Sequence, residues 1–139
     1  MKVSAKAEYA CLAMLALAQQ SADAPPLRIR EISRTHGIPE RYLVQILLQL
    51  KSAGLVASTR GASGGYRLSR RPQEIALSEV LLAIDGPDHA GRENPQAGSP
   101  ASRILAGVWE RVRQAERGVL DRTTIAELVE QSSPHEWTI

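Results

Sequence analysis

One stretch decides the fold of this 139-residue chain: Arg60-Gly61-Ala62-Ser63-Gly64-Gly65-Tyr66-Arg67-Leu68-Ser69-Arg70. Three glycines and a serine lie between two short runs typical of β-strands, residues 55–59 and 66–68. Glycine adopts the positive φ angles that tight connections require, so the pattern predicts a β-hairpin. Four arginines, the fourth being Arg71, flank this hairpin. Such dense positive charge favours a partner rich in phosphate or carboxylate groups.

A helix is expected directly before the hairpin, over residues 39–53, with Pro39 at its first position and Gly54 as its C-cap. Its inward side should consist of apolar residues spaced by three and four: Leu43, Ile46, Leu47 and Leu50. Its outward side is left to Arg41, Val44, Gln45, Leu48 and Gln49. A helix followed by a basic hairpin is typical of a winged helix, in which the helix enters the major groove of DNA and the hairpin contacts the flanking backbone.

Helices dominate the rest of the chain. We expect one over residues 3–20, a short one that ends at His36-Gly37, another over 77–84, and a last one that starts at the capping box Thr124-Ile125-Ala126-Glu127. An apolar stripe over residues 104–119 predicts a long amphipathic helix, which favours a dimer; packing within its own subunit is the alternative. The expected fold class is therefore mainly α, a winged helix-turn-helix with a long C-terminal dimerisation helix.

This pattern divides the chain into three parts. Residues 1–85 are interpreted as the winged helix-turn-helix DNA-binding domain, 86–101 as a flexible loop, and 102–139 as the dimerisation helix with a C-terminal helix. Charge follows a similar division. Residues 28–71 carry nine Lys or Arg against two acidic residues, whereas residues 72–139 carry six Arg against eleven Asp or Glu. This asymmetry favours a basic half that meets a polyanion, although two ordinary solvated faces are the alternative.

Several classes of protein are excluded. The single cysteine, Cys11, excludes an intramolecular disulfide and fits a reducing cytoplasm. No apolar run approaches the roughly 18 residues that span a membrane, and the chain shows no secretory signal, so we expect a cytoplasmic protein with no membrane partner. Residues 61–65 match the hydrolase pattern G-x-S-x-G, but a strand follows where that motif needs a helix. We therefore expect no enzyme.

The chain resembles the Rrf family of bacterial winged helix-turn-helix transcriptional regulators. The resemblance covers nearly the whole chain, and its segments are specific through their order and spacing. They are Lys6-Ala7-Glu8-Tyr9-Ala10, Ile29-Arg30-Glu31-Ile32, Gly37-Ile38-Pro39-Glu40-Arg41-Tyr42-Leu43-Val44-Gln45, Leu50-Lys51-Ser52-Ala53-Gly54-Leu55-Val56, the hairpin from Arg60 to Leu68, Ile75-Ala76-Leu77-Ser78-Glu79-Val80, Trp109, and Thr124-Ile125-Ala126-Glu127-Leu128.

The resemblance implies a homodimeric transcription factor in which long helices of two subunits cross and each hairpin reaches the minor groove of double-stranded DNA. Two departures limit what it implies. Iron–sulfur members of the family carry three cysteines in the loop before the long helix, whereas residues 86–102 contain none. Asp88, His89 and Glu93 are poor substitutes for thiolates, so we expect no cluster, no other cofactor and no metal. Val44 stands where cluster regulators often place a glutamate, so it should prefer a thymine methyl or tolerate any base.

These arguments assign sites. Phosphate contacts are expected from Arg28, Tyr42, Arg67 and Arg70, base contacts from Arg41, Val44 and Gln45, and minor-groove insertion from Arg60. The DNA-binding set also includes Glu40, Gly64, Gly65 and Tyr66. The dimer interface is assigned to Ile104, Leu105, Val108, Trp109, Val112, Ala115 and Val119.

The function expected from the sequence is a homodimeric repressor that reads a palindromic operator, with a small molecule or a protein as its effector. Two alternatives stay open. In the first, Cys11 makes the chain a thiol-based redox sensor, against the simpler reading of a buried, inert thiol. In the second, a partner protein docks on the acidic C-terminal half and controls the regulator.

Overall fold

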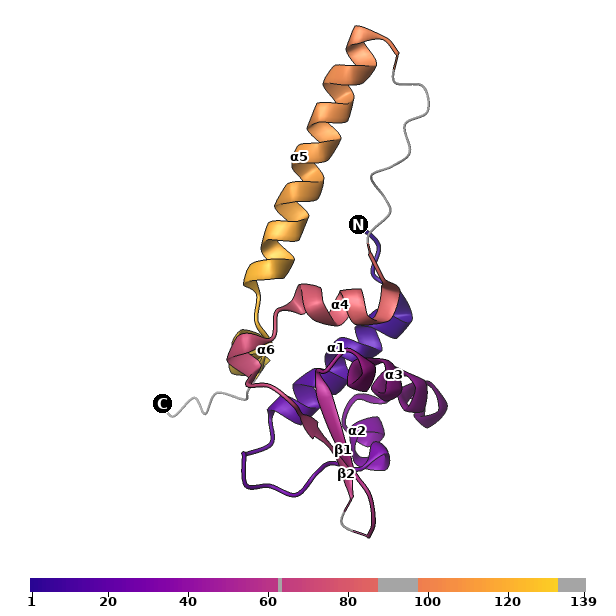
Figure 1. Cartoon of the computed structure of the whole chain (residues 1–139), viewed down its shortest axis with the longest axis vertical. Helices are drawn as coiled ribbons and strands as arrows, with labels where there is room; N and C mark the ends of the chain where they lie inside the picture. The colour runs from indigo at the N-terminus through magenta and orange to yellow at the C-terminus, as the bar shows by residue number, and fades with distance from the viewer. Residues whose placement is uncertain (63, 88–97, 133–139) are drawn as a thin grey trace, which may run out of the picture.

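The computed structural model describes residues 1–62, 64–87 and 98–132. Its elements are α1 (Ala5–Ala18), α2 (Ile29–His36), α3 (Glu40–Ser52), β1 (Val56–Thr59), β2 (Gly65–Leu68), the 3-10 helix η1 (Pro72–Glu74), α4 (Leu77–Asp85), α5 (Pro100–Arg122) and α6 (Ile125–Ser132). Figure 1 shows α1 to α4, α6 and the hairpin gathered in one body, from which α5 projects. The mainly α winged helix-turn-helix predicted from the sequence is confirmed.

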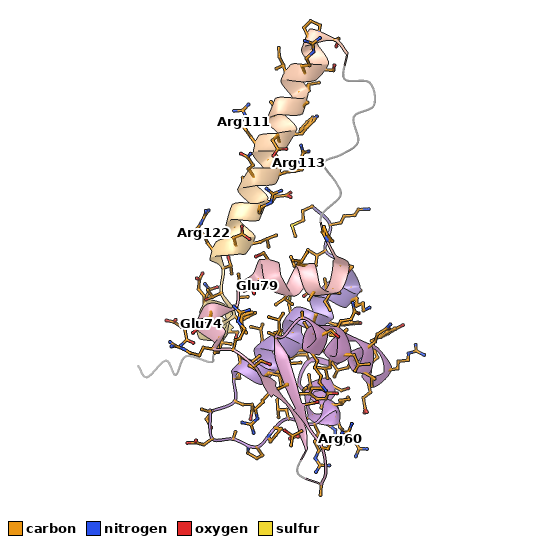
Figure 2. The ribbon with its side chains drawn as sticks, in the orientation of Figure 1. Arg60, Glu74, Glu79, Arg111, Arg113 and Arg122 are labelled. Atoms are coloured by element: carbon orange, nitrogen blue, oxygen red, sulfur yellow. The ribbon has the colours of Figure 1, made fainter. Side chains whose placement is uncertain are left out.

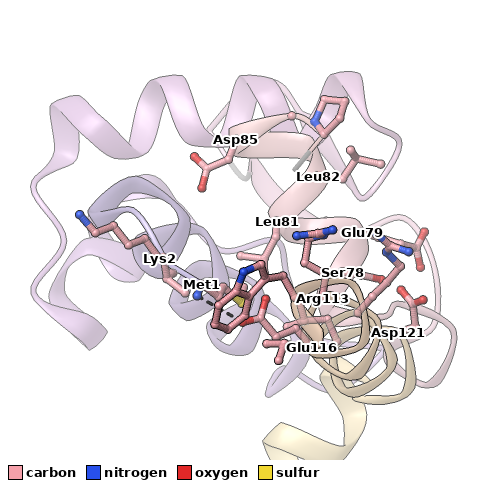
Figure 3. Close-up of a pocket in the computed structure, with 17 residues that line it drawn as sticks. Met1, Lys2, Ser78, Glu79, Leu81, Leu82, Asp85, Arg113, Glu116 and Asp121 are labelled. Atoms are coloured by element: carbon pink, nitrogen blue, oxygen red, sulfur yellow. Dashed lines mark ion pairs between the residues drawn. The ribbon is translucent and has the colours of Figure 1, made fainter. Parts of the chain in front are cut away.

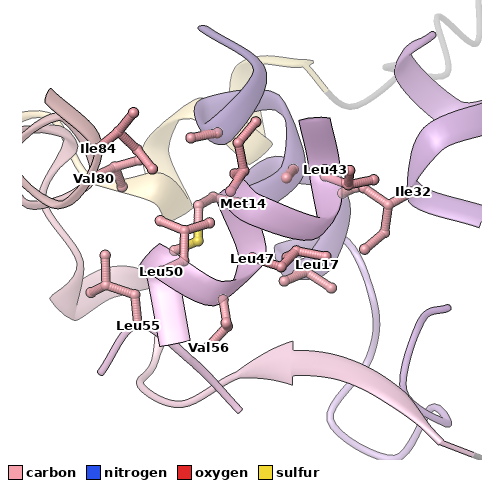
Figure 4. Packing of buried hydrophobic residues seen from close by; sticks show 14 of the residues in the cluster. Met14, Leu17, Ile32, Leu43, Leu47, Leu50, Leu55, Val56, Val80 and Ile84 are labelled. Atoms are coloured by element: carbon pink, nitrogen blue, oxygen red, sulfur yellow. The ribbon is translucent and has the colours of Figure 1, made fainter. Parts of the chain in front are cut away.

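The core of this body is aliphatic, as expected for a chain without phenylalanine. All four residues predicted on the inner side of α3 are fully buried, and they belong to the same buried cluster as Met14 of α1 (Figure 4). Helix α1 buries mainly alanines, namely Ala7, Ala10, Ala13 and Ala16. Because alanine side chains are short, α1 can approach its neighbours closely, and it contacts α2, α3, α4, α6 and β2.

The turn between α2 and α3 is fixed by local chemistry. Gly37 caps α2 with φ +66°, a left-handed conformation that glycine adopts without strain. The hydroxyl of Ser33 donates to the carbonyl of Ile38, and the Ile38 side chain is buried beneath the turn. Helix α3 begins at Glu40, one residue later than predicted, so Pro39 is its N-cap and offers no side-chain hydrogen bond. The helix-turn-helix is therefore held by the turn and by the buried face of α3.

The hairpin pairs β1 and β2 antiparallel, with Val56 opposite Leu68 and Thr59 opposite Gly65. We call β1, β2 and the residues between them the wing. The segment before α2 forms a further β-bridge with β2. Tyr66 N donates to the Leu27 carbonyl at 2.7 Å, and Leu27 N donates to the Tyr66 carbonyl at 2.9 Å. A Cβ on Gly65 would lie 2.5 Å from the Leu27 oxygen, so this close approach requires glycine.

Helix α5 carries no buried residue in this single chain, although it contacts α4. The chain then returns to the body, where Ile125 N donates to the Ile75 carbonyl at 2.9 Å and the Ile125 side chain is buried. Thr124 accepts from Glu127 N at 3.1 Å, which confirms the predicted helix start. None of the helices in residues 1–62, 64–87 and 98–132 has the length and hydropathy needed to cross a membrane.

Gln49 differs from the sequence prediction of an outward position on α3. It is half-buried, and its amide donates to the carbonyls of Ala83 and Ile84 at the end of α4. Most of the loop expected over 86–101 lies outside the described residues, since residues 88–97 are among those not described. Asp88, His89 and Glu93 belong to this range. The three-part division of the chain remains a prediction.

Candidate nucleic-acid interface

The outer face of α3, which we define as Arg41, Val44, Gln45 and Leu48, is exposed along its length. Val44 is 45% exposed and Leu48 is 54% exposed. This follows from helical geometry, because these positions lie opposite the four buried residues of the same helix. The face therefore offers one guanidinium, one amide and two apolar side chains to a partner. The acidic Glu40 lies beside it, exposed in the first turn.

An aromatic contact anchors the start of α3. The rings of Tyr9 on α1 and Tyr42 on α3 stack with centroids 6.2 Å apart and planes inclined by 22°. The guanidinium carbon of Arg41 lies 5.1 Å from the Tyr42 ring centroid, within the range of a cation–π contact. The sequence predicted roles for Tyr42 and Arg41 but gave no sign that Tyr9 contacts Tyr42, since helix α2 separates these two tyrosines in the chain.

The wing presents its cation at the tip. Arg60 is exposed at the end of the hairpin, away from α5 (Figure 2). Next to it Gly61 adopts φ +101°, and its carbonyl accepts from Gly64 N at 3.0 Å. Gly64 itself is buried, because Thr59 and Arg60 pass so close that they would collide with a Cβ. The structure thus gives Gly64 and Gly65 a role in shaping the hairpin.

Other predicted contact residues lie around this surface. Arg28 precedes α2 and is exposed, while its backbone N donates to Glu31 Oε1 at 3.0 Å. Arg67 on β2 is also exposed and makes only a long contact, 3.4 Å, with the Ala24 carbonyl. Tyr66 is half-buried against the core. In the described part of the chain, the guanidinium groups of Arg28, Arg60 and Arg67 are therefore exposed and paired with no carboxylate.

Arg70 forms hydrogen bonds within the chain that the sequence did not predict. Its guanidinium binds the Glu79 carboxylate, with Nη1 and Oε1 2.6 Å apart, and also donates to the Glu74 carbonyl. These acceptors hold Arg70 against η1 and the start of α4. A phosphate contact by Arg70 stays a prediction, and it would compete with these hydrogen bonds within the chain.

A second exposed surface runs along α5. Five large apolar residues of the predicted interface are exposed: Ile104, Leu105, Trp109, Val112 and Val119. Ala115 is also exposed, whereas Val108 is half-buried. Leu82 of α4 extends this apolar stripe, with 56% of its surface exposed. Exposed apolar residues gathered on one helix are typical of an interaction site.

A cavity of about 630 Å³ opens between α5, α4 and the N-terminal segment (Figure 3). Trp109 and Val112 of the stripe line it, as do Leu81 and Leu82 of α4. The terminal amine of Met1 lies 3.2 Å from a Glu116 oxygen across this space. Part of the stripe therefore faces the chain's own α4, while the first turns of α5 extend beyond the body.

The donor set suits no iron–sulfur cluster. Such a cluster is held by several thiolates, with occasional imidazoles, and this chain has one cysteine. Burial raises the pKa of the Cys11 thiol to about 11, and the carboxylates of Glu8 and Asp85 contribute to the same effect. Within residues 1–62, 64–87 and 98–132, no three His, Cys, Asp or Glu side chains gather to hold a metal ion.

Comparison with known proteins gives a consistent result. The model of the Rrf2 family, described as iron-dependent transcriptional regulators, matches residues 3–131. The chain is 37% identical to the HTH-type transcriptional regulator CymR of Bacillus subtilis over 128 residues, which cover 92% of this chain and 89% of CymR. It is 36% identical to the HTH-type transcriptional regulator IscR of Aliivibrio salmonicida over 133 residues, covering 93% of this chain and 77% of that protein. The solved structure of CymR, the global cysteine regulator of B. subtilis, aligns with a TM-score of 0.84 at 34% identity and covers 96% of this chain and 99% of its own.

Proposed function

Since the chain belongs to the Rrf2 family of DNA-binding transcriptional regulators, which are not enzymes, we propose that it is a homodimeric repressor of a palindromic operator. One observation carries the proposal. Helix α3 buries one side completely and leaves the outer face free, while the adjacent wing presents exposed Arg60 at its tip. A free helix face and a basic hairpin are what a winged helix needs to read one groove and contact the next.

The roles of individual residues follow from their chemistry. Arg41 and Gln45 can hydrogen-bond base edges in the major groove, and Val44 can meet a thymine methyl. Arg28, Tyr42 and Arg67 supply contacts to phosphates, which position the protein without reading sequence. We assign Arg60 to the minor groove, where narrow A·T-rich DNA concentrates negative potential. Glu40, exposed in the first turn of α3, carries a carboxylate that phosphate groups would repel.

A second copy of the chain is the proposed occupant of the apolar stripe on α5. The stripe is exposed in the single chain and runs along a 23-residue helix. A two-fold dimer would bury the stripe of both copies at once, because the same patch serves on each subunit. The two-fold axis would also match a palindromic operator, whose half-sites lie about one helical turn apart.

We further propose that the regulator works without a cluster. The support is the donor set, since Cys11 is the one thiol of the chain and is held protonated by burial. The same burial argues against the thiol-sensor alternative, because the thiolate is the reactive form of cysteine. Anaerobically purified protein should therefore show no absorption band near roughly 400 nm, where sulfur-to-iron charge transfer of clusters appears.

The decisive experiment is selection of genomic DNA fragments by the purified protein, followed by sequencing. We expect one palindromic motif to be enriched, and transcription in vitro from a promoter that contains it to fall when the protein is added. The double variant Arg41→Ala/Gln45→Ala should no longer enrich this motif. Arg122→Ala, which removes an arginine from the C-terminal end of α5, is the control and should still enrich the motif. Failure of the wild-type protein to enrich any motif at low salt would overturn the proposal.

A further inference from the structure

We propose that Tyr9 is a positioning residue for DNA readout. Its ring holds Tyr42, and through Tyr42 the guanidinium of Arg41, in place at the start of the recognition helix α3. Tyr9 itself lies on α1, outside the helix-turn-helix. The inference rests on the proposed function, because it assigns to Tyr9 the preparation of a side chain that reads DNA.

The contacts form a continuous series from the body to the outer face of α3. The stacked Tyr9 and Tyr42 rings have the centroid separation typical of favourable aromatic pairs. Arg41 then lies over the Tyr42 ring at 5.1 Å. Tyr9 is packed against the core, whereas Tyr42 is 46% exposed and Arg41 is exposed. The packed side chain of Tyr9 can therefore restrain Tyr42, and Tyr42 can restrain the exposed side chain of Arg41.

The exposed side of the first turn of α3 is where such support acts. Pro39 stands at the N-cap and provides no side-chain hydrogen bond to the free backbone N–H groups. The buried face of α3 begins only at Leu43, one residue after Tyr42. On this exposed side, the Tyr9 ring stacks on Tyr42, and Tyr42 in turn contacts the guanidinium of Arg41.

Holding Arg41 in advance has a direct consequence for binding. A free arginine side chain occupies many rotamers, and ordering it on the DNA opposes binding. A guanidinium already stacked on Tyr42 loses less freedom, and its planar fork is then aimed in one direction. The small residues of α1 contribute, because buried Ala7, Ala10 and Ala13 allow that helix to lie close enough for Tyr9 to reach α3.

A double-mutant cycle tests the proposal, with Tyr9→Leu and Arg41→Ala measured singly and together for operator affinity. Tyr9→Leu should raise Kd about two- to tenfold, as expected for loss of one aromatic pair. Arg41→Ala should then cost clearly less in the Tyr9→Leu background than in the wild type. Tyr9→Phe keeps the ring and should restore wild-type affinity. Leu12→Ala, which alters another partly buried residue of α1, is the matched control and should leave the Arg41→Ala penalty unchanged.

A measurement on the free protein keeps the inference separate from the proposed function. The heteronuclear ¹⁵N NOE of the Arg41 Nε–H group reports fast motion of the guanidinium, and it should fall in Tyr9→Leu but not in Tyr9→Phe or Leu12→Ala. If wild-type protein binds no operator while the NOE changes as expected, the proposed function fails and the positioning of Arg41 by Tyr9 stands. Additive penalties in the cycle, or a Tyr9→Phe variant as weak as Tyr9→Leu, would overturn the positioning role.

Discussion

Arg70, two residues after the end of the wing, is bound to Glu79 of α4, with Nη1 and Oε1 2.6 Å apart and Nη2 and Oε2 3.3 Å apart. Glu79 also accepts from the backbone N of Ala76 at 3.0 Å, so one carboxylate both caps α4 and holds the wing. The hydrogen bonds from Arg70 lower the pKa of Glu79, with a further contribution from Ala76. The wing is thus tied to the helix on which α5 packs.

Glu79→Gln should weaken this tie. Because the folded protein lowers the Glu79 pKa below its ordinary value of 4.5, the carboxylate stabilises the fold above that pH, and the contribution is lost as the pH falls through the lowered pKa. Both side chains are partly exposed, so we expect the melting temperature at neutral pH to drop by a few degrees at most.

The exposed pair Arg71–Glu74 supplies the control for this experiment. Its atoms are 3.6 Å apart and both side chains are well exposed, so Glu74→Gln should leave the melting temperature unchanged. The difference in melting temperature between Glu79→Gln and the wild type should disappear at acidic pH. A gap that persists unchanged below the ordinary pKa of glutamate would show that the carboxylate charge is not what stabilises the contact.

Gly64→Ala should distort the wing. A Cβ at this position would lie 2.2 Å from the Thr59 carbonyl oxygen, a backbone atom that can yield only if the hairpin shifts. We expect a loss of about 1–3 kcal/mol of unfolding free energy from the overpacking, measured by urea denaturation. DNA affinity should fall as well, because the shift moves Arg60. Gly107→Ala on α5 meets open space and should instead stabilise the protein by about 0.5–1 kcal/mol.

Ile104→Glu combined with Leu105→Glu should convert the protein to a monomer. Both residues are exposed in the single chain, at 70% and 50%, so the substitutions should not disturb its fold. In a dimer that buries the stripe, each unpaired carboxylate would cost several kcal/mol or so. Sedimentation velocity measures the outcome, and circular dichroism checks the fold. Gln114→Glu adds one carboxylate away from the stripe and should remain a dimer; a double variant that also remains a dimer would place the interface elsewhere.

Cys11 should make stability depend on alkaline pH. Its pKa is about 11 in the folded protein against 9.0 as the ordinary value, so the protonated thiol stabilises the fold fully below pH 9 and this contribution is lost as the pH rises through about 11. Relative to Cys11→Ala, the wild type should lose roughly 2–3 kcal/mol of unfolding free energy across this window. Alkylation by iodoacetamide at neutral pH should be slow; rapid alkylation of the folded protein would favour the thiol-sensor alternative.

Local patterns in the sequence predicted local structure well. The spacing of Leu43, Ile46, Leu47 and Leu50 is sufficient to orient α3, because helix periodicity and burial involve residues within a few turns. The glycines of the wing predicted a hairpin for the same reason. Even there the physical cause was partly different, since Gly64 is required by a close backbone approach and not by a positive φ.

Contacts between distant segments could not be predicted in this way. Gln49 is drawn inward by carbonyls at the end of α4, and Arg70 is engaged by Glu79, because tertiary packing brings these partners together. The Tyr9–Tyr42 stack joins residues 33 positions apart for the same reason. Periodicity shows which side of a helix faces the protein, but it does not show which element lies there.

The wing and the recognition helix should fail in different ways when single contacts are removed. Arg60→Ala deletes an exposed cation at the wing tip, so affinity should fall and the slope of log affinity against log salt should decrease by about 0.9 for each phosphate charge no longer neutralised. Preference for A·T-rich flanks should fade too, because the readout of groove width is lost. Gln45→Ala should relax preference at one operator position by about 1–3 kcal/mol and leave the salt slope nearly unchanged. Fluorescence anisotropy over a salt series, on operators with varied flanks and single base changes, separates the two. Wild-type affinity of Arg60→Ala for every sequence would mean that the wing does not touch DNA, and its exposed arginine would then have to serve another acidic partner.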